Sequence, residues 1–402
     1  MRLHITLFIL FSCLTTLGQS RMNSSEIGYL YDLDHEFLIE HKVASDEGKH
    51  KVYLKFSLNS GNVKVSDYLL TYDLRSNYTA EKEPNTEIQL DSSAILFTGI
   101  REFIYQFEVE TDSKQLIVLD IYNIPKNRRF KYDIPLVIGS RTAPPFMLFQ
   151  PETDIPYFSS YVNKGDKVRI RDVFREDGNF EVTGFQVNAG IPMPPFDDTA
   201  IEPAEPVVLD TLYGTQQNEL FTFYNEGYYK ISASKERQQS LYLLVTDPYY
   251  PFFNDYNKLA RPLIFLSTND EYTALQEAKD SRDGFEEFVQ NTISSNQRVA
   301  KDFIKYFYRR IRKAGRLFTT DRDGWKTDRG MIYLIFGNPL QVFRNEKTEL
   351  WVYSSGNGGR LRFVFDRVEN EGAVTYNLIR GNRYKEDWMT AVTQWRSGRI
   401  IE

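Results

Sequence analysis

Cysteine is almost absent from this chain, which has 402 residues and a single cysteine at position 13. Cys13 lies within an apolar N-terminal segment, so a form without that segment has no cysteine and no disulfide. Small secreted domains usually depend on disulfides, because their cores are too small to hold the fold alone. A disulfide-free chain of this length must instead be stabilised by hydrophobic cores.

Histidine is also scarce, with four residues at positions 4, 35, 41 and 50 and none beyond. A Ser-His-Asp or Cys-His site is therefore excluded from everything after His50, because the base is missing. The histidine zinc signatures, the Walker loop and the dinucleotide glycine fingerprint are absent as well. His35, His41 and His50 could approach one another across neighbouring strands, but nothing in their spacing is typical of metal ligands. We expect neither a metal nor a cofactor.

Long hydrophobic runs are missing after the N-terminal segment, and the charges nearly balance. No later segment approaches the ~20 apolar residues of a membrane-spanning helix. The net charge of −6 is distributed over a mixed sequence, which argues against a nucleic-acid partner.

The N-terminal segment has the three parts of a secretion signal. Arg2 supplies the positive start, an apolar run extends from Ile5 to about Leu17, and small residues precede a cut before Gln19. Residues 1–19 are therefore predicted to be a signal peptide. A second interpretation stays open, because the four residues ending at Cys13 (LFSC) loosely resemble a lipobox, in which the cysteine would be acylated. We favour cleavage near Gly18 and expect membrane attachment only through a lipid on Cys13.

Aromatic residues make up 15% of the chain, and β structure is predicted for most of its length. The run 52–58 alternates strictly, with Val52, Leu54, Phe56 and Leu58 on one face. Six further strand-like runs lie at 31–40, 67–74, 88–97, 103–109, 115–123 and 130–139. Short runs at this spacing predict a β-sandwich domain over residues 26–140.

A second β-sandwich, of immunoglobulin-like type, is predicted over residues 141–247. It follows Pro144-Pro145, and its clearest strands are 167–170, 180–187, 220–224, 228–233 and 241–245. The turn at Glu226-Gly227 before Tyr228-Tyr229 is typical of immunoglobulin-like modules, where a tyrosine packs over a corner. Residues 192–206 are rich in proline and acids and read as a loop.

The character changes in residues 248–402, which predict an α+β domain. Helices are expected at 270–280, with Asn269 or Asp270 as the cap, and at 284–292, 296–317 and 384–394. Strands are expected at 331–336, 350–353, 361–365 and 374–379. The helix 296–317 has one apolar face, and its other face carries Lys301, Lys305, Arg309, Arg312 and Lys313. That basic face is either a solvated surface or a surface for an anionic partner.

Residues 324–339 form the most distinctive block, GWKTDRGMIYLIFGNP, called here the 324–339 motif. Its marked residues are Gly324, Trp325, Thr327, Asp328, Arg329, Gly330, Gly337 and Pro339. The block resembles the GWxTD domain family of Bacteroidetes-type bacteria, and the resemblance covers roughly residues 262–380. Together with the strand patterns, the resemblance predicts a fold class that is mainly β with a C-terminal α+β domain: two tandem β-sandwiches followed by a GWxTD domain. Residues 288–292 (FVQNT) depart from the Phe-Trp and Arg-Asp-Pro pattern of the family.

From the residues alone, every part of the motif also has a structural explanation. Trp325 is expected to be buried with its N–H paired. Thr327 and Asp328 can accept hydrogen bonds from backbone amides and organise the chain entering the next element. A site for a ligand or partner is the alternative, because conspicuous loops often carry function. Asp321, Asp323 and Asp328 faintly resemble a calcium loop, but its full pattern is missing.

These observations predict a non-catalytic envelope protein, exported to the periplasm or the periplasmic face of the outer membrane of a Gram-negative bacterium. It would be a subunit or accessory of an outer-membrane assembly, secretion or transport complex, with other envelope proteins as partners. The alternative is a carboxylate-based hydrolase, or a binding protein, acting on envelope glycan or peptide. Sugar binding on tryptophan platforms needs exposed rings, whereas Trp351, Trp388 and Trp395 are expected in the core.

Overall fold

The computed structural model describes residues 21–61, 64–138, 141–187, 190–199, 207–233, 239–356, 358–370 and 373–399. The chain forms two compact units. Unit 1 comprises residues up to 158 with 169–178 and 341–350, and unit 2 comprises 159–168, 179–340 and 351 onward. The predicted signal peptide with Cys13, and residues 200–206 of the predicted loop, lie outside the described residues. The domain boundaries near 140 and 247 stay predictions.

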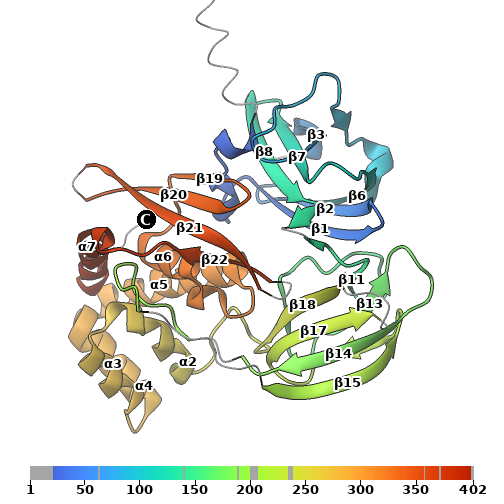
Figure 1. Cartoon of the computed structure of the whole chain (residues 1–402). Coiled ribbons are helices and arrows are strands. Elements are labelled where there is room, and N and C mark those ends of the chain that lie inside the picture. The colour runs from blue at the N-terminus through green and yellow to red at the C-terminus, as the bar shows by residue number, and fades with distance from the viewer. Residues whose placement is uncertain are drawn as a thin grey trace, which may run out of the picture. The chain divides into compact units, whose positions relative to one another are not determined.

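Unit 1 contains two four-stranded antiparallel sheets (Figure 1). The first has the order β1 (Phe37–Asp46), β2 (Lys49–Leu58), β6 (Glu102–Glu110), β5 (Ile95–Thr98). The second has the order β4 (Ile88–Gln89), β3 (Tyr68–Arg75), β7 (Leu116–Asn123), β8 (Arg128–Pro135). This arrangement confirms the predicted β-sandwich.

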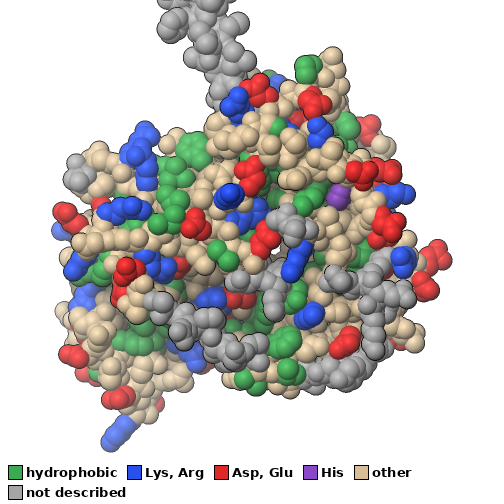
Figure 2. All heavy atoms as spheres, viewed as in Figure 1, with side chains coloured by type: hydrophobic (Ala, Val, Ile, Leu, Met, Phe, Trp, Pro, Cys, Tyr) green, Lys and Arg blue, Asp and Glu red, His purple; other side chains and the backbone are tan. Residues whose placement is uncertain are grey.

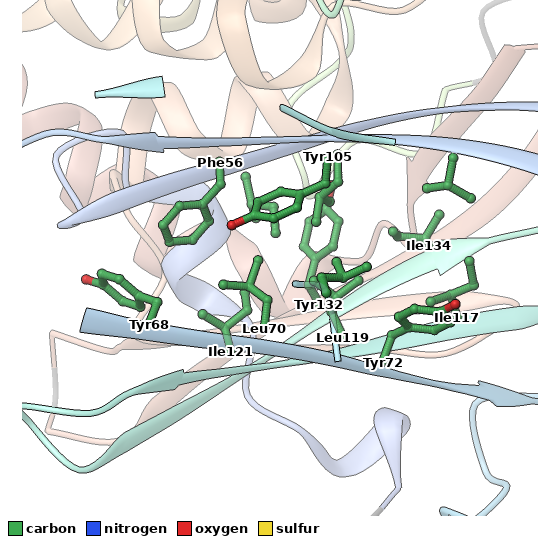
Figure 3. Close-up of a cluster of buried hydrophobic side chains, with 14 of the residues drawn as sticks. Phe56, Tyr68, Leu70, Tyr72, Tyr105, Ile117, Leu119, Ile121, Tyr132 and Ile134 are labelled. Atoms are coloured by element: carbon green, nitrogen blue, oxygen red, sulfur yellow. The ribbon is translucent and has the colours of Figure 1, made fainter. Parts of the chain in front are cut away.

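Figure 3 shows the core between these sheets, with Phe56 and Tyr105 facing Leu70, Leu119 and Ile121. The alternating residues of β2 are all buried, as their period of two requires. Two predicted runs differ from the structure. The run 31–40 becomes a strand only at Phe37, after a 3-10 turn. The run 88–97 is interrupted by a 3-10 turn, because the Asp91 side chain accepts a hydrogen bond from the Ser93 amide.

Three shorter parts complete unit 1. Strands β9 (Val137–Ile138) and β10 (Arg141–Thr142) pair with each other, and β11 (Phe146–Phe149) pairs antiparallel with β13 (Lys167–Asp172). The third part is the segment 341–350, which holds β19 (Gln341–Arg344) and is far along the chain from the rest of the unit.

Unit 2 begins with a five-stranded sheet. Its order is β12 (Tyr161–Asn163), β18 (Ser240–Thr246), β17 (Gly227–Ala233), β14 (Asn179–Phe185), β15 (Val208–Gln216), and β12 runs parallel to β18. The short strand β16 (Leu220–Thr222) lies outside this five-stranded sheet, in the sheet of order β11-β13-β16. The Tyr229 hydroxyl donates to the Asn225 carbonyl at 2.9 Å. This bond is the tyrosine corner of immunoglobulin-like sandwiches and confirms the predicted fold class.

Strand β15 has no counterpart among the predicted strands. It follows a proline-rich loop, and the pairing of β14 with β15 has two register shifts, between Phe180 and Val182 and between Gly184 and Phe185. Such bulges interrupt the strict alternation by which strands are recognised in a sequence.

Helices follow the sheet in unit 2: α2 (Tyr256–Ala260), α3 (Asn269–Gln276), α4 (Ser281–Phe288), α5 (Gln297–Phe318), α6 (Asp328–Phe336) and α7 (Lys385–Arg396). The expected helices are confirmed, but Asn269 or Asp270 as the cap of α3 is wrong. Thr268 is the N-cap, in a reciprocal capping box with Glu271. None of the helices in the described ranges is both long and apolar enough to cross a membrane.

The predicted strand over 331–336 is wrong, because these residues form most of α6. A short, wholly buried apolar run has no periodicity to separate helix from strand. Thr327 decides between them, since its side chain accepts a hydrogen bond from the Gly330 amide and starts a helix. The remaining strands are β20 (Thr348–Ser354), β21 (Arg360–Asn370) and β22 (Ala373–Leu378), which Figure 1 shows beside α5 and α6.

Glu271 and Arg396 join α3 to α7 by two hydrogen bonds of 2.7 and 2.8 Å. The hydrogen bond from Arg396 lowers the pKa of Glu271 from its ordinary 4.5 to about 2. A carboxyl whose folded-state pKa is depressed stabilises the fold above its unfolded pKa and loses this contribution as the pH falls toward 2. We expect Glu271→Gln to cost about 1–2 kcal/mol at neutral pH, after allowing for solvent screening, and almost nothing near pH 2. Melting temperatures at the two pH values measure the difference; an equal loss at both would contradict it.

Candidate functional site

The 324–339 motif forms a 3-10 turn, η8 (Gly324–Lys326), that leads into α6. The Thr327 hydroxyl donates to the Gly324 carbonyl at 2.7 Å and accepts from the Gly330 amide at 3.0 Å. One hydroxyl thus satisfies both ends of a tight reversal and caps the helix. The expectation that Thr327 organises the following element is confirmed.

Two glycines let three backbone segments meet at this turn. A Cβ atom on Gly324 would lie 2.0 Å from the Ala314 carbonyl oxygen of α5. A Cβ atom on Gly330 would lie 1.8 Å from the Gly324 carbonyl oxygen. Neither distance is compatible with a side chain, so α5, η8 and α6 can approach this closely only at glycine.

Tyr250 holds the turn through hydrogen bonds of its hydroxyl group. Its hydroxyl accepts from the Gly324 amide at 2.9 Å and lies 2.5 Å from the Thr319 hydroxyl, which donates to the Gly315 carbonyl. Burial raises the pKa of Tyr250 far above its ordinary value, so the phenol remains neutral. The chain of bonds ties the turn to the C-terminal end of α5.

Trp325 is buried, as expected, with 1% of its surface exposed. Its ring contacts Phe265 edge-on at 6.2 Å, and the Lys326 ammonium lies 5.4 Å from the ring centre. The expected pairing of its N–H is not found, because Nε1 is buried without a hydrogen-bond partner in the described part of the chain. Apolar packing holds this residue, and no hydrogen bond orients it.

Asp328 is held on both carboxylate oxygens. Oδ2 accepts from the Leu378 amide at 2.7 Å and from Arg380 at 2.9 Å, and Oδ1 lies 2.5 Å from Arg380 Nη2. Arg380 also donates to the Met193 carbonyl at 3.1 Å. The two side chains are only 10% and 19% exposed. The ion pair therefore connects the first turn of α6 with the end of β22 and with the loop at Met193.

The rest of the motif is packed in a similar way. The Arg329 guanidinium lies 3.9 Å from the ring centre of Tyr376 and 5.3 Å from that of Phe318. Gly337 ends α6 with a φ of 82°, which favours glycine, and its carbonyl accepts from the Tyr353 hydroxyl at 2.9 Å. Pro339 is buried in the following turn.

Arg310 caps the other end of α6. Its Nη1 donates to the Leu334 and Ile335 carbonyls at 3.1 and 3.0 Å, and Trp395 Nε1 also donates to Ile335 at 3.1 Å. Burial lowers the pKa of Arg310 to about 10, so the residue stays charged at neutral pH. The C-terminal carbonyls of α6 thus receive a cation that favours their end of the helix dipole.

Arg310, Arg380 and Tyr250 were missed by sequence reasoning. Arg310 gave a weak signal, because it is a basic residue on the face of α5 that also carries Phe303, Phe307 and Ala314. Arg380 and Tyr250 gave none, since they lie 52 and 74 residues from their partners in the motif.

The other candidate residues each contact partners of their own. Asp321 pairs with Arg322 at 2.7 Å and Asp323 with Lys326 at 2.8 Å, so these acids do not converge with Asp328 on one point. The ring nitrogens of His35, His41 and His50 contact Phe37, Tyr132 and Ser45. Across the described ranges, no group of three histidine, cysteine or acidic residues could hold a metal. Trp351, Trp388 and Trp395 lie in the core, as expected.

Unit 1 has a buried charge network of its own. Arg344 donates to Asp133 at 3.0 and 3.1 Å, to Glu349 at 2.6 Å and to the Tyr31 hydroxyl at 2.7 Å. The Asp133 and Glu349 side chains are fully buried, and Arg344 is 16% exposed. Tyr78 donates to Asp133 at 2.7 Å and Tyr31 to Glu349 at 2.7 Å. This network holds the segment 341–350 in unit 1.

Comparisons with known proteins match the chain to a family and to several solved structures. No curated protein sequence matches the chain significantly. A solved structure titled "Crystal structure of DIP-gamma IG1+IG2" covers 53% of this chain and 97% of its own, at 11% identity and a TM-score of 0.17. That score is too low to support any argument about the fold. The GWxTD domain family matches residues 227–397, the range that holds the turn, α6 and their partners. The chain therefore carries a GWxTD domain at residues 227–397.

Proposed function

We propose that this chain is a non-catalytic protein of the cell envelope, a periplasm-facing subunit or accessory of an outer-membrane assembly, secretion or transport complex. It would be exported by residues 1–19 in a Bacteroidetes-type, Gram-negative bacterium. A lipid on Cys13 is the alternative to cleavage near Gly18. The proposal rests on an exposed apolar hairpin in unit 1, supported by the structural use of the 324–339 motif.

The hairpin that joins β5 to β6 presents apolar side chains to solvent. Ile100 lies at its tip and is 98% exposed, and Leu96 and Phe97 on β5 are 36% and 39% exposed. The Gly99 amide donates to the Glu102 carbonyl at 2.7 Å and closes the turn, which fixes the position of Ile100. An apolar residue at the tip of an ordered hairpin is typical of a contact that another protein covers.

Strand β5 is also the edge of its sheet. Natural proteins usually protect such edges with charged residues or proline, because unpaired backbone groups invite another strand. Here the pairing of β5 with β6 has one register shift, between Ile95 and Phe97, and two of the three exposed side chains of β5, Leu96 and Phe97, are apolar. The occupant that fits best is an extended segment of a partner protein, which would pair with β5 and cover Phe97 and Ile100.

The 324–339 motif supports this proposal, because its residues have structural roles. Thr327 caps a helix, Asp328 is saturated by Leu378 and Arg380, and Trp325 is packed in the core. The hydrolase alternative needs two acids poised near Trp325. The nearby Asp323 and Asp328 are instead bound to Lys326 and Arg380, and so give that alternative no support.

Ile100→Lys should reduce the amount of partner protein that co-purifies with the chain by at least tenfold, because a charge at the centre of an apolar contact costs about 2 kcal/mol or more. The measurement is affinity purification of the tagged full chain from native membranes, followed by quantitative mass spectrometry. Stability should not change, since Ile100 is exposed.

Ile124→Lys is the matched control, because Ile124 is half exposed on a different turn of the same unit. This variant should retain the partner in full. Recovery of the wild-type chain only as a free monomer would refute the proposal, and equal losses for both variants would show that the hairpin is not the contact.

A further inference from the structure

Helix α5 carries a straight stripe of cations. Arg298, Lys301, Lys305, Arg309, Arg312 and Arg316 follow one another at steps of three or four residues, so they share one face of the helix. The opposite face, with Phe303, Phe307, Ile311 and Ala314, is buried in unit 2. Its first and last cations are 18 residues apart, or about 27 Å along the axis.

Most of the stripe faces solvent. Arg298, Lys301, Lys305, Arg309 and Arg316 are exposed, and Arg312 is half-buried. Asp302 is the only acidic residue on the helix. Burial, and after it the positive charge of Arg309, lowers the pKa of Arg312. Arg309 therefore acts on Arg312 as a like charge on the same face.

Exposed aromatic residues lie beside the C-terminal half of the stripe. Arg312 lies 5.4 Å from the ring centre of Phe252, which is 61% exposed. Tyr249 is 59% exposed, and its carbonyl accepts from the Phe252 amide at 2.8 Å. Pro251 between them packs against Gly315 of α5. The loop 249–252 thus holds the Phe252 ring next to Arg312, with Tyr249 as a second exposed aromatic residue in the same turn.

We propose that the α5 stripe, with Tyr249 and Phe252, binds the surface of a membrane that contains anionic phospholipids. Cations on a straight helix face fit a plane of headgroup phosphates, and exposed aromatic rings beside them fit the boundary between headgroups and acyl chains. At physiological salt the net charge of −6 opposes this binding only weakly, because charges beyond the Debye length of about 8 Å are largely screened. Acidic and basic side chains are also interspersed on the face that Figure 2 shows. This lipid surface is distinct from the protein partner proposed for the β5–β6 hairpin.

Vesicle co-sedimentation of the full chain tests the proposal. The chain should bind vesicles that contain phosphatidylglycerol more tightly than vesicles of pure phosphatidylcholine, and the difference should shrink as salt is raised. Binding to pure phosphatidylcholine reports the apolar contributions of the N-terminal segment and of the loop 249–252, and the preference for anionic vesicles is measured relative to it. A wild-type chain that shows no preference for the anionic vesicles would overturn the proposal.

The decisive variant replaces Arg298, Lys301, Lys305 and Arg316 by glutamine. Each cation near an anionic surface contributes about fivefold in affinity, so the preference for anionic vesicles should fall on the order of a hundredfold or more. Phe252→Ser should weaken binding at all salt concentrations, because its contribution is apolar. The circular dichroism spectrum should be unchanged, since all four replaced side chains are exposed.

The control replaces Lys64, Arg128, Lys279 and Lys347 by glutamine. These four cations are exposed and lie off the stripe, so the net charge changes equally. Retention of anionic binding by this variant, with loss by the stripe variant, supports the proposal. Equal losses in both would show a nonspecific charge effect, and binding to heparin or duplex DNA without binding to anionic vesicles would assign the stripe to another polyanion; either result overturns it.

Discussion

Gly330→Ala should destabilise unit 2 by about 3 kcal/mol or more, one of the largest effects expected from a single added methyl group. The new Cβ atom would lie 1.8 Å from the Gly324 carbonyl oxygen and 3.1 Å from the Thr327 hydroxyl. Relief requires α6 to move away from η8, which breaks the two hydrogen bonds of Thr327. The added methyl group also reduces the entropy of the unfolded chain, but only by up to about 1 kcal/mol.

Thermal unfolding of the wild-type and Gly330→Ala chains measures this loss. Gly356→Ala is the matched control, because its Cβ atom would meet nothing closer than a Thr390 methyl at 3.9 Å. The control should unfold close to the wild-type temperature. If Gly330→Ala did so as well, the tight meeting of α5, η8 and α6 would not exist in solution.

Arg344→Met should destabilise unit 1 by about 3–5 kcal/mol, because it leaves two fully buried carboxylates without their counter-ion. Asp133 and Glu349 are both 0% exposed, and Arg344 donates to each. Methionine fills a similar space, so the loss reports charge more than packing.

Two further variants test whether the loss of charge causes the destabilisation by Arg344→Met. Tyr31→Phe removes hydrogen bonds to the same network without removing charge and should cost only about 1 kcal/mol. Combining Arg344→Met with Asp133→Asn and Glu349→Gln should recover much of the stability, because no buried charge remains. A triple variant as unstable as Arg344→Met alone would contradict the electrostatic explanation.

Much of the fold could be predicted because strands and helices with one buried face show a regular spacing of apolar residues. The alternation of Val52, Leu54, Phe56 and Leu58 matches a strand with one buried face, and the spacing of Phe307, Ile311 and Ala314 matches the buried face of α5. Residues 331–336 lacked such a pattern, because all but the last are fully buried. They form a helix because Thr327 caps it. A single capping residue is a weak signal in a sequence when an uninterrupted apolar run follows it.

The site was predictable in its residues but not in its partners. Glycine at positions 324 and 330 and the hydroxyl of Thr327 indicated a tight turn. The partners Arg380 and Tyr250 come from distant parts of the chain, and their pairing follows only from tertiary structure. The position of segment 341–350 could not be predicted for the same reason. Arg344 and Glu349 are charged residues, which are usually exposed, yet they belong to the buried network of unit 1.

We propose that the 324–339 motif builds the fold, while the β5–β6 hairpin makes the contact with the partner. The most direct test compares partner recovery for two folded variants, Asp328→Asn and Ile100→Lys, in the native-membrane purification. Asp328→Asn weakens the pair with Arg380 but leaves the hairpin intact. We expect Asp328→Asn, at a temperature where it is folded, to recover as much partner protein as the wild type. We expect Ile100→Lys to lose the partner. Loss of the partner with folded Asp328→Asn, and retention with Ile100→Lys, would contradict it.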